Sequence, residues 1–177
     1  MNIGDILIYC VPVIAGLSLY FLLLNKNTKL LNYSLLTLLG TQTISLVMLI
    51  YFFYTTNLEY KYVSDYSSTD LNLFYKLSGL WAGRDGTLLI WTWSATLFML
   101  LERKYNKNND KQKELTTAIC TFIILALTII QLYINPFRIN EVVPDEGNGL
   151  NPLLLSPYMI IHPPIVFISY GMIVLLY

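Results

Sequence analysis

Long apolar runs are the feature that most constrains how this chain can fold. An α-helix needs roughly 20 apolar residues to cross a bilayer. Four runs approach or exceed that length, and a fifth, shorter run begins at Pro163. These runs lie at about 3–24, 31–54, 86–102, 115–134 and 163–177. Of the 177 residues, 55% are hydrophobic and only 12% are charged, against about 25% charged in a soluble domain. We therefore expect an all-α fold, a single polytopic transmembrane helical bundle over 1–177 with about five spans.

The basic residues predict the orientation of this bundle. Lys and Arg in short flanking loops stay on the cytoplasmic or matrix side of a membrane. Loops 25–30 and 103–114 fall on one side if the spans alternate, and they hold seven of the eleven basic residues. We expect these two loops on the inner face. The N-terminus, loop 55–85 and loop 135–162 are then expected on the outer face.

The net charge, the placement of the charged residues and the two cysteines limit the classes of function that this chain can have. The net charge is zero, so we expect no nucleic-acid partner. Four of the spans have no ionisable side chain in their interior, whereas pumps and ion-coupled transporters place such groups at mid-membrane. Cys10 and Cys120 lie in separate spans near opposite faces and form no CxxC motif, which predicts packing roles and no disulfide.

The only histidine, His162, directly precedes Pro163 and Pro164. A residue before proline is pushed out of helical geometry, and proline suits the first turn of a helix. We therefore expect His162 in extended backbone at the outer edge of the fifth span, with the apolar segment 151–161 lying along the surface. This setting suits haem, whose iron accepts a neutral imidazole nitrogen. The alternative is an interfacial histidine that only hydrogen-bonds a carbonyl.

A second stretch, "KLSGLWAGRDGTLLIWTW", enters the third span. One interpretation is an aromatic belt with snorkelling charges at the membrane boundary. The other is a docking lip, in which Trp81 stacks on a flat ligand and Arg84 meets an anionic group. Arg138, in the next outer loop, is a further candidate for contact with a propionate.

The two stretches together resemble the N-terminal part of CcmF, the membrane haem lyase subunit of cytochrome c maturation. That family has a Trp-Gly-Gly-x-Glu-Gly motif before Ser-Leu-Leu-Leu-Trp, and "WAGRDGTLLIW" is similar to it, with Ala82 for the second residue and Asp85 for glutamate. The family's "GLNPLLxxPxxxxHPP" segment is similar to residues 149–164, which read "GLNPLLLSPYMIIHPP". The resemblance covers essentially the whole chain.

The resemblance implies a function. The histidine of the HPP segment is one of two outer axial ligands to haem b awaiting attachment, so His162 is expected to ligate the haem iron, and Trp81 and Arg84 are expected to contact the haem. The second ligand, a tryptophan-rich loop and further histidines would come from partner CcmF-like subunits. Apocytochrome c and membrane lipid are the other expected partners. The chain is expected to act in a haem lyase complex and not to be active alone.

Composition bears on location. Ile, Asn, Lys, Tyr and Phe abound while Ala and Arg are scarce, a bias typical of AT-rich genomes such as those of organelles or certain prokaryotes. We therefore expect the mitochondrial inner membrane, with a prokaryotic plasma membrane as the alternative, and a piece of a split or longer haem lyase. The alternative function is a structural membrane subunit of a respiratory assembly that binds no haem.

Overall fold

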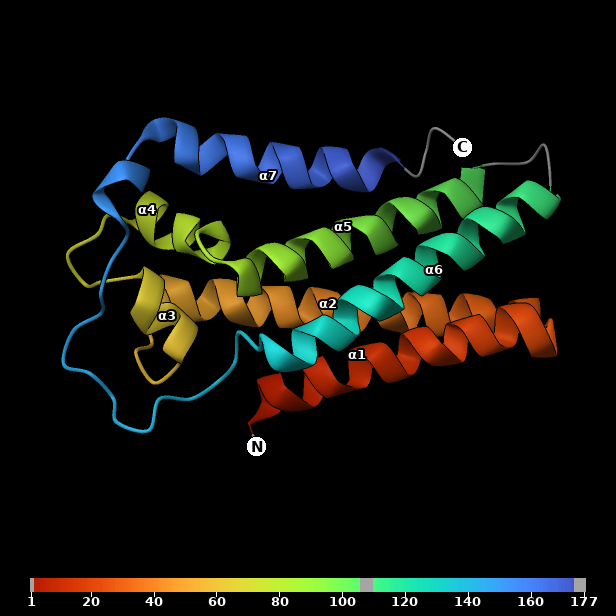
Figure 1. Cartoon of the computed structure of the whole chain (residues 1–177), viewed down its shortest axis with the longest axis horizontal. Coiled ribbons are helices and arrows are strands. Elements are labelled where there is room, and N and C mark those ends of the chain that lie inside the picture. The colour runs from red at the N-terminus through yellow and green to blue at the C-terminus, as the bar shows by residue number, and fades with distance from the viewer. Residues whose placement is uncertain (1, 106–109, 174–177) are drawn as a thin grey trace.

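Helices make up the chain in the computed structural model, which describes residues 2–105 and 110–173. Seven α-helices occur in these ranges, and three short turns of π- or 3-10 helix accompany them (Figure 1). The α-helices are α1 (Ile3–Tyr20), α2 (Thr28–Thr55), α3 (Lys61–Tyr66), α4 (Leu73–Ser78), α5 (Arg84–Tyr105), α6 (Asp110–Tyr133) and α7 (Pro157–Met172). The π-helical turn Phe21–Asn25 continues α1, and the 3-10 turns are Gly79–Trp81 and Pro152–Leu154.

Four long helices form the body of the molecule. Helix α1 packs against α2 and α6, and α5 packs against α2, α6 and α7. Figure 1 shows these helices running side by side, with α7 lying along α5 on the side away from α1. The short helices α3 and α4 gather at the end that carries the N-terminus, which we call the N-terminal end. This is the helical membrane bundle that the apolar runs predict.

The long helices differ in how apolar they are. Helix α1 with its π-helical turn, α2 and α6 are each long and apolar enough to cross a membrane. Helix α5 has 22 residues, about 33 Å at 1.5 Å per residue, but it is less apolar. Its place between α2, α6 and α7 accounts for this, because a helix enclosed by other helices presents less surface to lipid.

The start of α1 shows how local sequence sets a helix boundary. Asn2 accepts a hydrogen bond from the Asp5 backbone N–H at 2.8 Å, and its own N–H donates to the Asp5 carboxylate at 2.9 Å. This reciprocal capping box satisfies backbone donors that a helix start leaves unpaired. The Asn2 side chain also donates to the Phe137 carbonyl at 2.7 Å, so the cap ties the start of α1 to the loop after α6.

The fifth predicted span differs from the structure. Helix α7 begins at Pro157, so His162 lies inside the helix and not in extended backbone before it. Pro157 supplies the fixed φ of a first helical position, and the fixed φ of Pro163 and Pro164 is also compatible with a helix. Those two prolines remove two N–H donors and crowd the preceding turn, but the helix continues through them. The predicted end of this span, 174–177, lies outside the described residues.

The other boundaries move by a few residues. Helix α6 starts at Asp110, so part of the basic loop predicted at 103–114 is helical. Helix α5 extends the predicted 86–102 by two residues at its start and three at its end. Cys10 is exposed and Cys120 is half-buried, and both are free thiols.

Candidate functional site

The segment from Gly79 to Gly86 folds over the buried ring of Tyr62 on α3. The Tyr62 hydroxyl lies 3.0 Å from the Leu80 carbonyl oxygen and 3.1 Å from the Gly83 carbonyl oxygen, and it accepts from the Gly83 N–H at 3.2 Å. Burial raises the pKa of the Tyr62 phenol above its ordinary value, which keeps the hydroxyl neutral and able to donate. One side chain therefore holds the turn that leads into α5.

The glycines of this segment allow the close packing. A Cβ added at Gly83 would lie 2.6 Å from the Tyr66 ring, and one added at Gly86 would lie 1.8 Å from the Leu80 carbonyl oxygen. Neither position has room for a side chain. The spacing of glycines in "WAGRDG" thus has a structural explanation in this fold, independent of any ligand.

A polar pocket of about 550 Å³ opens beside this turn. Helices α3, α5 and α6 and the loop after α6 contribute its walls, and its charged lining residues are Lys61, Asp65, Arg84, Asp85 and Arg138. Three cationic and two anionic groups leave a net charge of plus one. We call this the Arg84 pocket. It brings the two predicted anion-binding arginines, Arg84 and Arg138, to one cavity, and both side chains are exposed.

Trp81 takes a different position. It is half-buried and packs against the apolar core cluster that includes Tyr62 and Leu80, and it is not among the residues that line the Arg84 pocket. Its ring belongs in large part to the packing of the turn.

His162 lies on an exposed face of α7. Tyr158, one turn earlier, is 82% exposed, and Ile161 and Ile165 beside it are also exposed. None of the α7 side chains that the structure describes lines the Arg84 pocket, so His162 does not share a cavity with the two arginines. The described residues also contain no group of three or more His, Cys, Asp or Glu side chains that could hold a metal ion. The imidazole is thus exposed among apolar side chains of α7.

Helix α7 is held in place by close contact with α5. The Ser94 hydroxyl lies 2.9 Å from the Trp91 carbonyl oxygen of its own helix and 3.2 Å from the Phe167 carbonyl oxygen of α7, so the two carbonyls share its single hydrogen. Gly171 is buried, and a Cβ added there would lie 2.8 Å from the Ser94 hydroxyl oxygen. The small residue lets α7 approach α5, and this contact fixes the orientation of the helix that carries His162.

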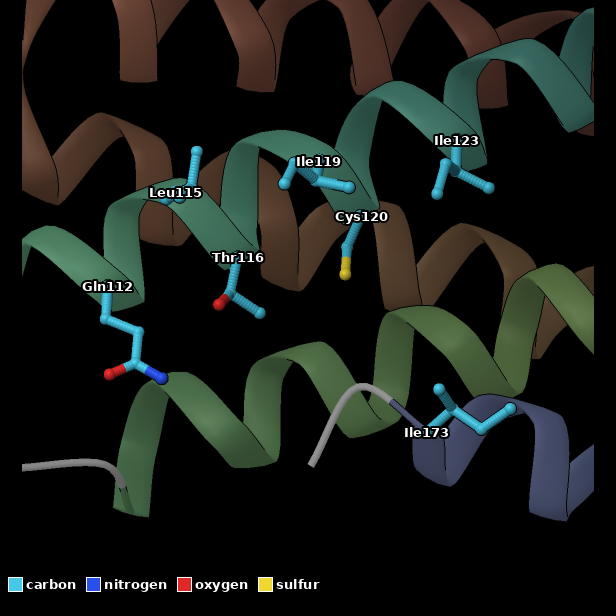
Figure 2. A pocket seen from close by; sticks show the side chains of 7 residues that line it. All are labelled: Gln112, Leu115, Thr116, Ile119, Cys120, Ile123 and Ile173. Atoms are coloured by element: carbon cyan, nitrogen blue, oxygen red, sulfur yellow. The ribbon is translucent and has the colours of Figure 1, made fainter. Parts of the chain in front are cut away.

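The sequence gives no sign of two further features. Lys61 and Asp65 enter the Arg84 pocket from α3, a helix that no apolar run marks. An apolar groove of about 480 Å³ also runs between α6 and the end of α7, where Cys120, Ile123 and Ile173 line it (Figure 2). Both arise where segments distant in sequence meet. The lining is mostly apolar, and Gln112 and Thr116 are among its polar members.

Comparison with known proteins places the chain in a family. Residues 81–177, more than half of the chain, match the model of the family described as "Cytochrome C assembly protein". The chain is 31% identical over 156 residues to the cytochrome c-type biogenesis protein NrfE of Haemophilus influenzae, covering 85% of this chain and 24% of that protein. It is 33% identical over 132 residues to the probable NrfE of Escherichia coli, covering 70% of this chain and 23% of that protein.

A CcmF protein is also similar. The cytochrome c-type biogenesis protein CcmF of Haemophilus influenzae is 27% identical over 136 residues, covering 75% of this chain and 21% of that protein. The chain therefore spans about a quarter or less of the length of these relatives. No solved structure gives a significant match. On the family match, which includes both the turn at Trp81 and the helix of His162, this chain belongs to the cytochrome c assembly protein family.

Proposed function

We propose that the chain is the N-terminal part of a CcmF-like haem lyase and contributes one axial ligand, His162, to the haem b that is the substrate for attachment to apocytochrome c. The observation that carries the proposal is the exposed imidazole of the single histidine on an apolar face of α7. A neutral imidazole nitrogen is a good ligand for haem iron, and the exposed side chains of Tyr158, Ile161 and Ile165 offer the apolar surface that a macrocycle needs.

The described residues fit half of such a site. With one histidine in these 177 residues, coordination by two histidines needs a ligand from outside them. Partner subunits with a tryptophan-rich loop and further histidines would supply it. His162 then fixes the iron on the outer side while the partner closes the opposite face and presents the haem vinyl groups to the apocytochrome thiols.

Arg84 and Trp81 have secondary roles in this proposal. Arg84 and Arg138 share one pocket, where two guanidinium groups can bind carboxylates in bidentate geometry. The described residues that line this pocket include none from α7. A haem that contacts both His162 and Arg84 must therefore extend from α7 to the pocket, or α7 must shift toward it. Trp81 would contact haem through the part of its ring that remains exposed.

The membrane is the site of action in either location. The relatives named above are bacterial, which fits a prokaryotic plasma membrane. The composition bias favours the mitochondrial inner membrane. Fractionation of the source cells, with the chain detected immunologically, decides between these two membranes.

The test uses the complex purified with its partner subunits. In the wild type we expect the Soret and α-band absorbance of six-coordinate haem. His162→Ala should remove or shift these bands while the complex keeps its composition, and added imidazole should restore them. Ser169→Ala, an exposed change on the same helix, is the matched control and should leave the spectrum unchanged.

The alternative function, a structural membrane subunit, predicts a different result in this experiment. A structural membrane subunit would show the same haem spectrum in His162→Ala as in the wild type, or no haem in an intact wild-type complex. Either result overturns the proposed ligand.

A further inference from the structure

A layer of buried polar side chains crosses the interior of the four-helix body. Neighbouring helices pack in a ring, α1 with α2, α2 with α5, α5 with α6 and α6 with α1. Two apolar clusters fill the ring, one with Leu49 and Leu89 toward the N-terminal end and one with Leu38 and Met99 toward the other end. The side chains between these clusters are polar and fully or almost fully buried: Gln42, Ser45, Thr92, Thr96, Thr128 and Gln131.

Helical spacing places these residues on the core faces of their helices. On α2, Gln42 and Ser45 fall between the core residues Leu38 and Leu49 at steps of three and four. On α5, Thr92 and Thr96 fall between Leu89 and Met99 in the same way. Residues three and four apart share one face of a helix. The polar side chains therefore point the same way as the apolar side chains that fill the core.

Hydrogen bonds between helices fix the relative heights. The Trp93 indole N–H donates to Thr43 at 3.0 Å, which sets α5 against α2. The Thr121 hydroxyl lies 3.4 Å from the Met99 sulfur, which sets α6 against α5. Counting along antiparallel neighbours from these pairs puts Thr128 level with Thr92, and both within about one helical turn of Gln42. Gln131 lies about one turn beyond Thr128 on the same face.

The hydroxyl groups of this layer have no hydrogen to offer. Ser45 donates to the Thr41 carbonyl at 3.0 Å, Thr92 to Leu88 at 2.9 Å and Thr128 to Leu125 at 2.9 Å. Thr96 donates in the same way to the Thr92 carbonyl at 2.8 Å. Each hydroxyl oxygen can therefore act toward the interior only as an acceptor.

The buried side-chain amide of Gln42 lacks the hydrogen bonds that such a group needs. Among the described residues, neither its amide oxygen nor its amide nitrogen has a hydrogen-bond partner, and the same holds for the amide nitrogen of Gln131. Buried polar groups in proteins are nearly always hydrogen-bonded, to protein or to ordered water. The Gln42 oxygen needs a donor, and the neighbouring hydroxyls supply only acceptors.

A further acceptor comes from α1. Pro12 lies inside this helix and has no N–H, so the carbonyl of Ile8, four residues earlier, has no helical partner. The Asn135 amide donates to Asp5 at 2.6 Å, and counting from that pair puts Ile8 level with Leu132, next to Gln131. The interior between Gln131 and Gln42 thus has several acceptors, and two amide groups remain to be satisfied.

The chemistry selects one class of ligand. A cation would satisfy the Gln42 oxygen but would be repelled by the amide N–H groups, and an anion would do the reverse. Water donates two hydrogen bonds and accepts two, and buried waters typically make about three bonds to otherwise unsatisfied groups. We propose that the polar layer binds internal water, with Gln42 as its principal ligand and Gln131 as a second.

The test uses the full chain in lipid nanodiscs, labelled with nitrogen-15 at its glutamine side chains. The sequence has three glutamines, Gln42, Gln112 and Gln131, and single substitutions assign their signals. We expect a nuclear Overhauser cross-peak between the Gln42 side-chain amide and water, with the sign of a long-lived bound water. Exposed Gln112 is the control and should show only rapid exchange with bulk solvent. Absence of the Gln42 cross-peak overturns the proposal.

Two variants test whether the bound water lies in this polar layer. Thr92→Val conserves shape but removes an acceptor, so the water cross-peak of Gln42 should weaken while the chain stays folded. Gln42→Leu should remove bound water and weaken the cross-peak of Gln131. If the Gln42 cross-peak has the same intensity in Thr92→Val as in the wild type, the proposed water is not in this layer. If Gln42 pairs directly with a protein oxygen, its cross-peak is missing from the start, which also overturns the proposal.

Discussion

The Tyr62 hydroxyl accepts a hydrogen bond from the Gly83 N–H at 3.2 Å and lies within 3.1 Å of the Gly83 carbonyl oxygen. A side chain of the short helix α3 thereby holds both backbone groups of a residue 21 positions later in the chain. This contact organises the turn before α5 and one wall of the Arg84 pocket.

Tyr62→Phe is expected to destabilise the folded chain. The substitution conserves the ring but leaves buried backbone groups of Leu80 and Gly83 unpaired, which typically costs about 1–3 kcal/mol. Thermal unfolding in detergent, followed by circular dichroism, measures the loss. Tyr33→Phe changes an exposed tyrosine on α2 and should leave the melting temperature unchanged. Equal melting temperatures for Tyr62→Phe and the wild type would contradict the role given to this hydroxyl.

Two glycine substitutions should have opposite effects. Gly86→Ala places a Cβ 1.8 Å from the Leu80 carbonyl oxygen, and relieving such overlap costs about 1–3 kcal/mol or more. Gly40→Ala meets nothing within 4 Å on α2, and replacing a mid-helix glycine by alanine stabilises by about 0.5–1 kcal/mol. The same unfolding assay measures both variants. A tolerated Gly86→Ala would mean that the turn does not pack as described.

The position of α7 should depend on Gly171. In Gly171→Ala the new methyl group meets the Ser94 hydroxyl oxygen at 2.8 Å, so α7 is expected to move away from α5 and to become more accessible to protease. Adding Ser94→Ala removes that oxygen and should restore part of the protection, although Phe98 still lies 2.9 Å from the methyl position. Limited proteolysis of the three proteins gives the comparison. Full protection in Gly171→Ala would contradict the close contact.

Glu146 gives a prediction for pH. Its carboxylate accepts hydrogen bonds from the hydroxyl and the backbone N–H of Thr69 and from the N–H of Gly147. The Thr69 hydroxyl bond is the first of the causes that lower the pKa of Glu146 below its ordinary value. Because the folded pKa is depressed, the contact stabilises the fold above the unfolded pKa of about 4.3 and is lost as pH falls through the folded pKa.

The Thr69 amide chemical shift is the measurement for this contact. During acid titration its midpoint is expected below about 4.3, the ordinary value of a glutamate. Thr69→Val keeps the backbone donor but removes the hydroxyl, so the midpoint should move up toward that value. A wild-type midpoint at or above the ordinary value would show that Thr69 and Glu146 do not pair in solution.

The sequence alone determined the class of fold. Helices with few ionisable side chains can satisfy their backbone groups internally in lipid, and the apolar runs predicted the long helices within a few residues at most boundaries. The chemical types of the candidate residues were also readable, because a single histidine between an apolar segment and two prolines is unusual in any chain. The start of α7 was predicted wrongly, because the preference against helix before proline is local and α7 continues through its two prolines.

Only the tertiary structure decided which residues meet. Arg84 and Arg138 share a pocket with Lys61 and Asp65 of α3, while His162 is not among its lining residues, and no local pattern contains that information. The glycines of "WAGRDG" pack closely against Tyr62, Tyr66 and Leu80, and the polar layer around Gln42 exists because three helices place buried polar residues within about two helical turns of one another. Hydrophobic periodicity reports how far a helix extends and which face is buried. The partner across that face is set by packing among segments far apart in the chain.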